Sequence, residues 1–208
     1  FSPTLAGSGR ASVRETVIEW LRRVPALIRS SVDSSRVVVG LKIFNALFDD
    51  EFQLELLRSV QAAGDDEAAD WLIYGNRLFD PLREFEGHRG IAYGGPDLSD
   101  RNLRVLSAFQ EEVGSTIRPL AATGNINNGR MALEYALRGA SSFQLHTFFQ
   151  LPAEQYVLTS GSRTQKALHE LYLHPENGLV VWLEHLARRW GLPRDPLRFV
   201  DIVGRGRP

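Results

Sequence analysis

Short apolar runs alternate with stretches of helical spacing along this chain, and that alternation limits the possible folds more than any other feature. Residues 37–41 form an apolar run broken only by one glycine, which is typical of a parallel strand buried on both faces. The sequence predicts four strands, over residues 36–44, 71–74, 118–123 and 142–147. Because strands separated by helices pair in parallel through right-handed crossovers, the predicted class is α/β.

Helices are predicted in the intervals between these strands. They cover residues 11–30, 50–64, 99–113, 130–137, 163–172 and 177–190. Pro25 is expected to kink or divide the first helix. Residues 77–98, rich in Gly, Pro and charge, are predicted as a long connection, and connections of that length are usually functional or mobile. Four strands do not close an eight-stranded barrel, so the chain is either a small open α/β sheet or the back half of a barrel.

Composition narrows the function classes. The 208 residues suit one domain over 1–208, and a net charge of −1 gives no sign of a nucleic-acid partner. The absence of cysteine excludes disulfides and a cysteine nucleophile in this chain, and the five histidines lack ligand spacing, so no metal is expected. With no apolar run long enough to span a membrane, the expected location is the cytoplasm.

The segment from Thr123 to Thr147 has the arrangement of a phosphate clamp. One predicted strand ends at Thr123-Gly124-Asn125, and after a helix the next ends at Gln144-Leu145-His146-Thr147. A phosphate needs several backbone N–H groups that converge on one point, and glycine lets the backbone come close to it. In (β/α) barrels such a site commonly lies in the loops after the last two strands.

This segment resembles the flavin-binding end of the dihydroorotate dehydrogenase family. Asn125 and Met131 depart from the family pattern, where Gly and Asp stand. Ten positions fall in register with the family pattern without a gap, and Asn125 is the one among them where the residue type differs: Gly124, Asn125, Ile126, Gly129, Ala132, Glu134, Gly139, Ala140, Gln144 and Thr147. The resemblance implies a (β/α)8 TIM barrel of which this chain supplies about the last four β/α units. It also implies FMN as the cofactor, with its phosphate held by Thr123, Gly124, Asn125, His146 and Thr147.

Upstream segments extend the resemblance. Lys42 stands where the family has a lysine against the flavin, and Gly94-Gly95 resembles a family turn that touches the flavin, shortened here by two residues. Asn76 follows Gly75 in a segment that resembles the family's strand end and is a candidate substrate contact. A lysine at the pyrimidine edge of the flavin would stabilise its anionic reduced form.

The first residues complete the resemblance. Ser2 precedes Pro3 and stands at the position where the family carries its catalytic base. Thr4 stands at, or next to, the position where the family usually has a substrate-binding asparagine. The resemblance implies that Ser2 takes the C5 proton of dihydroorotate while C6 gives a hydride to FMN, forming orotate in pyrimidine biosynthesis. Soluble relatives are often dimers, so a homodimer is the candidate assembly.

Three alternatives stand beside this hypothesis. The substrate could be another dihydropyrimidine. The clamp alone would also suit a phosphate-binding isomerase or aldolase without redox chemistry. An inactive fragment is the third, because a half barrel exposes two sheet edges and an apolar interior.

Overall fold

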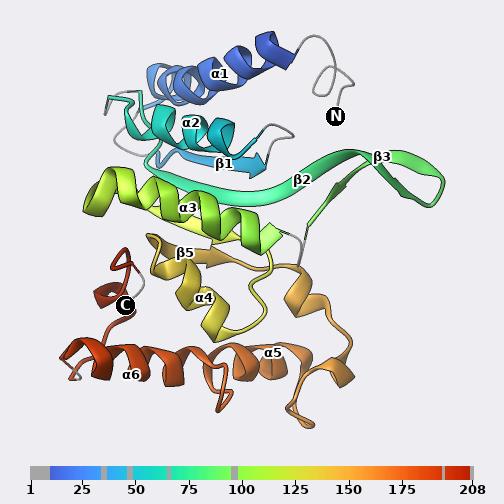
Figure 1. The fold of residues 1–208 in the computed structure, drawn as a ribbon, viewed down its shortest axis with the longest axis vertical. Coiled ribbons are helices and arrows are strands. Elements are labelled where there is room, and N and C mark those ends of the chain that lie inside the picture. The colour runs from blue at the N-terminus through green and yellow to red at the C-terminus, as the bar shows by residue number, and fades with distance from the viewer. Residues whose placement is uncertain are drawn as a thin grey trace.

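The computed structural model describes residues 10–33, 37–45, 49–64, 67–94, 98–193 and 195–206. Helices and strands alternate through most of this length (Figure 1). In chain order they are α1 (Arg10–Ser31), β1 (Gly40–Asn45), α2 (Asp50–Gln61), β2 (Trp71–Phe85), β3 (His88–Tyr93), α3 (Ser99–Val113), β4 (Leu120–Thr123), α4 (Gly129–Ala136), β5 (Ala140–Gln144), α5 (Arg163–Tyr172) and α6 (Leu179–Trp190). Short 3-10 turns lie at η4 (Gly114–Thr116), η5 (Thr147–Gln150), η6 (Ala153–Gln155) and η7 (Phe199–Asp201).

Four strands form a parallel sheet in the order β1-β2-β4-β5. The predicted α/β class is therefore confirmed, as are the four predicted strands. Their ends are shifted by a few residues, except that β2 continues from its predicted end at Tyr74 to Phe85. Among the described residues the sheet is open, with β1 and β5 at its edges, and it does not close into a barrel.

The prediction of one long connection over residues 77–98 is wrong for residues 77–93, which are mostly strand. β2 continues beyond the parallel sheet and pairs with β3 in the antiparallel sense, from Leu78 opposite Tyr93 to Phe85 opposite His88. Figure 1 shows this two-stranded ribbon projecting from the body. Glu86 and Gly87, with φ of 50° and 76°, form its turn, as the tightest hairpin turns require.

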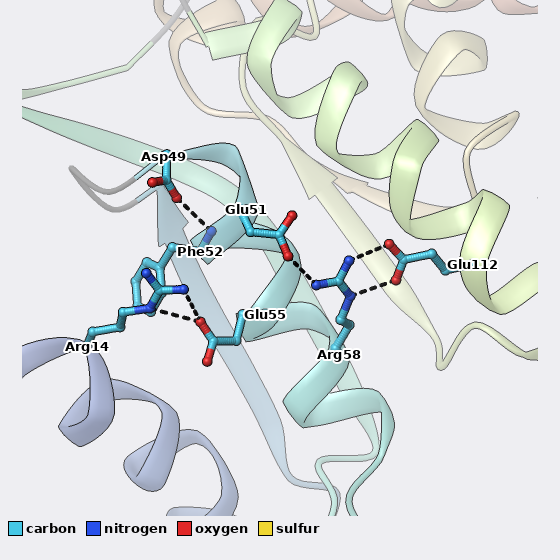
Figure 2. A network of polar contacts seen from close by, with 7 residues as sticks. All are labelled: Arg14, Asp49, Glu51, Phe52, Glu55, Arg58 and Glu112. Carbon is cyan, nitrogen blue, oxygen red and sulfur yellow. Dashed lines mark hydrogen bonds and ion pairs between the residues drawn. The ribbon is translucent and has the colours of Figure 1, made fainter. Parts of the chain in front are cut away.

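Helix ends follow local chemistry, and Pro25 does not divide the first helix, which was one of its two predicted effects. α1 continues through Pro25 as one helix. α2 begins after Asp49, whose carboxylate accepts a hydrogen bond from the backbone N–H of Phe52 at 3.0 Å (Figure 2). Such a cap satisfies one of the N–H groups left unpaired at a helix start.

The main core lies between the sheet and helices α2, α3 and α4. Apolar side chains of the helices pack on alternate residues of the strands, as the period of two along a strand requires. The core residues of the strands are Ile43, Leu72, Tyr74, Leu120, Ala122 and Ala140. Residues between these positions on β1, β2 and β4, such as Lys42, Ile73 and Ala121, therefore occupy the opposite face of the sheet.

Ion pairs join α2 to the helices on either side of it. Arg58 donates to both carboxylate oxygens of Glu112 on α3, at 2.7 and 2.5 Å, and to Glu51 at 2.5 Å. Arg14 on α1 donates to Glu55 at 2.9 and 2.5 Å (Figure 2). Because these groups are partly exposed, each pair adds little stability, but together they orient α2 between α1 and α3.

At the start of α2, Asp50 accepts hydrogen bonds from two arginines, and their contribution to stability depends on pH. Burial alone would raise the pKa of Asp50, but hydrogen bonds from Arg104 at 2.6 Å and Arg101 at 3.0 Å outweigh it and hold the pKa below 3.8. A carboxylate whose pKa is lower in the folded state than in the unfolded state stabilises the fold at pH values above its unfolded pKa. This contribution is lost as the pH falls through the folded pKa.

We expect Asp50→Asn to lower the free energy of unfolding by less than about 1 kcal/mol near pH 7, since the pair is partly exposed. The difference should be smaller at a second pH well below 3.8, because the carboxylate is protonated as the pH falls through the lowered folded pKa. Urea unfolding of both proteins at the two pH values tests this expectation. A difference that is the same at both would contradict it.

No helix in the described part of the chain is both long and apolar enough to cross a membrane.

Candidate functional site

The carboxyl ends of the parallel strands carry most of the predicted site residues. Lys42 on β1 lies opposite Ile73 on β2, which lies opposite Ala121 on β4, which lies opposite Ser142 on β5. One row across the sheet therefore joins the lysine to the strand that leads into His146 and Thr147. Ligands of open parallel sheets bind at this carboxyl edge.

The face of the sheet that bears Lys42 is concave. The Nζ atom of Lys42 donates a 2.6 Å hydrogen bond to Oε1 of Gln144 on β5, although β2 and β4 lie between the two strands. On a flat sheet three interstrand spacings would separate these strands by roughly 14 Å. The two side chains meet because the sheet curls around them, and both remain exposed.

An irregularity in β5 directs Gln144 to this face. Leu120 lies opposite Ala140, but Ala121 lies opposite Ser142, so β5 holds one extra residue at Ser141. Since successive side chains of a strand point to opposite faces, one extra residue reverses the face of everything after it. Without this bulge Gln144 would share the core face with Ala140.

Two neighbouring loops carry backbone N–H groups suited to a phosphate. Gly124 and Asn125 follow β4 with φ of 108° and 53°, and His146 and Thr147 follow β5. Thr123 at the end of β4 pairs with Gln144 at the end of β5, so the loops are adjacent. The N–H of Gly124 takes part in the pairing of β4 with β5, whereas among the described residues none accepts a hydrogen bond from the backbone N–H groups of Asn125, His146 and Thr147.

The N–H groups of Arg130 and Met131 at the start of α4 are bonded within the protein and are not open to this cradle. The N–H of Arg130 donates to Asn177 O at 2.9 Å, and the N–H of Met131 donates to the side chain of Asn128 at 2.8 Å. A Cβ added to Gly129 would lie 1.9 Å from the backbone nitrogen of Leu179. The helix therefore begins against the turn before α6, and its first N–H groups are already bonded.

Asn76 and Gly94 come together although 18 positions of sequence separate them. Asn76 is half-buried where β2 leaves the parallel sheet, and β3 returns the chain beside it. A Cβ at Gly94 would lie 3.8 Å from the carbonyl oxygen of Asn76. The predicted substrate contact Asn76 and the predicted flavin contact Gly94 therefore lie side by side at the base of the ribbon.

Ser2, Thr4 and Gly95 lie outside the described residues. Their roles as base, substrate contact and flavin contact stay predictions. Thr123 is described, and its carbonyl oxygen accepts a hydrogen bond from the side chain of Asn102 at 3.0 Å. That contact belongs to a polar cluster that the sequence analysis missed.

Five fully buried polar side chains lie beneath the strand ends: Asn45, Gln53, Tyr74, Asn102 and Tyr135. Asn102 is at their centre, where it accepts from Asn45 at 2.8 Å. Tyr135 donates to Gly124 O at 2.8 Å, and burial raises its pKa to about 12, so it is a neutral donor at physiological pH. The sequence did carry a signal for this cluster. Asn102 is a polar residue on the apolar face of α3, which it shares with Val105, Leu106 and Phe109.

A cavity of about 420 Å³ lies on the other side of β5 from Lys42. Its lining is mainly apolar and comes from the surroundings of α4, α5 and η7, including Leu171, Tyr172 and Phe199. Ile126 and Leu145 also line it, so it adjoins the two loops without containing Lys42 or Asn76.

Comparison with known proteins supports the fold. No protein-family model and no curated protein sequence matches the chain. Among solved structures, the ferulenol complex of dihydroorotate dehydrogenase (DHODH) from Eimeria tenella matches with a TM-score of 0.52 and 16% identity, covering 80% of this chain and 37% of that one. Ligand-free DHODH from the same organism matches with a TM-score of 0.53 and 19% identity, covering 83% and 41%. The chain has a DHODH-like fold and spans about two fifths of the length of these structures.

Proposed function

We propose that this chain supplies the phosphate end and one wall of the FMN site of a DHODH-like oxidoreductase. The observation that carries the proposal is the pair of adjacent loops after β4 and β5, in which no described residue accepts a hydrogen bond from the backbone N–H groups of Asn125, His146 and Thr147. Lys42 is exposed on the concave face of the same sheet. A dianionic phosphate tail and an electron-rich ring edge are the groups that such a set of donors would bind.

The proposed roles divide between the two ends of the cofactor. The N–H groups of Asn125, His146 and Thr147 would hold the phosphate, because backbone donors placed close together suit its oxygens, and Gly124 would let the backbone come close to it. Lys42 would hold the isoalloxazine ring, in place of its present bond to Gln144. When bound, FMN would supply the acceptor for a hydride from the substrate.

The substrate roles rest on the sequence resemblance. Asn76 would bind a polar group of the substrate, and its place beside Gly94 supports a shared pocket at the base of the ribbon. Ser2 is the proposed base and Thr4 the proposed substrate contact, with dihydroorotate as the proposed substrate. The cytoplasm and a homodimer remain the expected location and assembly.

Titration with FMN, riboflavin and inorganic phosphate tests the cofactor. We expect FMN to bind, with quenching of its fluorescence, and riboflavin to bind at least tenfold more weakly because it lacks the phosphate, a loss of about 1.4 kcal/mol or more. A protein that binds phosphate but neither flavin would favour the isomerase or aldolase alternative. A protein without affinity for any of the three would overturn the proposal.

Replacing Lys42 tests the ring end of the site. We expect Lys42→Met to weaken FMN binding roughly tenfold, since a hydrogen bond to a charged donor contributes about 1.5–3 kcal/mol. The thermal midpoint should change little, because both Lys42 and its partner Gln144 are exposed. Arg23→Met is the matched control, since it removes one positive charge from an exposed ion pair on α1. Equal FMN affinity in the two variants would exclude a flavin contact by Lys42.

Substrate identity needs a redox measurement on a protein loaded with FMN. Under exclusion of oxygen, dihydroorotate should bleach the flavin absorbance as the hydride is transferred. Bleaching by another dihydropyrimidine, without bleaching by dihydroorotate, would keep the flavin chemistry and change the substrate.

A further inference from the structure

Asn102 lies fully buried beneath the candidate site, on the helix side of the sheet. Its side-chain nitrogen donates to Gly75 O at 3.1 Å and to Thr123 O at 3.0 Å. Its side-chain oxygen accepts from Asn45 at 2.8 Å. One amide group therefore contacts the last residues of β1 and β4 and, on β2, the residue that follows its pairing with β4.

These contacts begin where the sheet's own pairing ends. β2 and β4 are paired from Leu72 opposite Leu120 to Tyr74 opposite Ala122. The next positions on the two strands are Gly75 and Thr123, whose carbonyl oxygens both bond to Asn102. The pairing of β1 with β2 also becomes irregular before Asn45. The Asn102 side chain thus takes the place of the next rung between these strands.

Two glycines, Gly75 and Gly124, lie directly against the Asn102 side chain. Gly75 and Gly124 have φ of 88° and 108°. A Cβ at Gly75 would lie 2.2 Å from the Asn102 nitrogen, and a Cβ at Gly124 would lie 2.8 Å from it. Tyr135 adds a donor to Gly124 O. Asn102 therefore occupies the space that a side chain would need at either glycine, so both positions require glycine. It also bonds to Gly75 O and Thr123 O, beside these two turns.

We propose that Asn102 is a positioning residue that sets the spacing of the strand ends, and with it the distance between Asn76 and the Gly124-Asn125 loop. The inference rests on the proposed FMN site for its functional meaning. Asn102 touches no part of the concave face. It acts through the backbone, because two rigid carbonyl groups bonded to one amide have little freedom to move apart.

Amide hydrogen exchange and FMN titration on Asn102→Ala test this assignment. We expect exchange at Gly75 and Gly124, whose N–H groups take part in strand pairing, to become at least about tenfold faster, because local opening there would no longer have to break the Asn102 bonds. FMN affinity should fall by at least about tenfold. Leu186→Ala is the control for general destabilisation, since Leu186 is buried in a separate cluster with Leu133 and Ile202. It should lower the thermal midpoint while both of the other measurements stay near wild type.

Tyr135→Phe is the second variant, and it keeps the test decisive if Asn102→Ala does not fold. It removes the bond to Gly124 O and the 3.3 Å bond that Asn102 donates to the Tyr135 hydroxyl, but it keeps the Asn102 bonds to Gly75 O and Thr123 O. Exchange should therefore rise at Gly124 and rise less at Gly75. The assignment is overturned if Asn102→Ala and Leu186→Ala show the same exchange and affinity, or if Tyr135→Phe leaves exchange at Gly124 unchanged. If the wild-type protein does not bind FMN, the proposed function fails, while the exchange measurement still decides the role of Asn102.

Discussion

Gly129→Ala is expected to destabilise the fold by about 4 kcal/mol or more, at the upper end of single substitutions. The new Cβ would lie 1.9 Å from Leu179 N, 2.4 Å from Gly178 C and 2.4 Å from Leu171 O. All three are backbone atoms, so no side chain can turn aside to make room. The clash can be relieved only by separating α4 from the turn before α6, which would also break the 2.9 Å bond from Arg130 N to Asn177 O.

Urea unfolding followed by far-ultraviolet circular dichroism measures this effect. The matched control is Gly64→Ala, because a Cβ at Gly64 has no heavy atom within 4 Å. The control should change stability by no more than about 0.5 kcal/mol. If Gly129→Ala unfolds at the same urea concentration as the control, the close packing of α4 against the α5–α6 turn is wrong.

Gly124→Ala is expected to lower stability by about 2–3 kcal/mol and FMN affinity by at least about tenfold. Backbone strain and a steric clash both contribute to the loss of stability. The φ of 108° is outside the conformations that alanine adopts readily, and the Cβ would meet Asn102 Nδ2 at 2.8 Å and Gly75 O at 3.2 Å. The affinity falls because relief of the clash moves the N–H group of Asn125.

Gly87→Ala separates strain from the clash. Gly87 has a φ of 76° and open space where a Cβ would be, so alanine there should cost about 1–2 kcal/mol from backbone strain alone. FMN affinity should be unchanged in this control, because Gly87 lies at the tip of the β2–β3 ribbon. If both variants lose equal stability and both bind FMN as the wild type does, the loop after β4 is not the phosphate site.

Local pattern was sufficient for much of the fold. The alternation of apolar runs and helical stretches predicted the four parallel strands and the helices between them. The connection over 77–98 was misjudged because its Gly and Pro content suggested a loop. In the structure the two halves pair as a ribbon, and the Glu86-Gly87 turn that joins them was the overlooked signal.

The sequence by itself determined the order of elements and the two loops of the candidate phosphate site, because glycine turns and strand periods act over a few residues. Only the tertiary structure decided what meets across the sheet. Lys42 and Gln144 are 102 positions apart, and their contact depends on sheet curvature and on the extra residue at Ser141. Asn102 likewise became central through strand ends that lie 27 and 21 positions away from it. The structure also showed that the start of α4 is closed by the turn before α6, since packing between distant elements leaves no mark on local sequence.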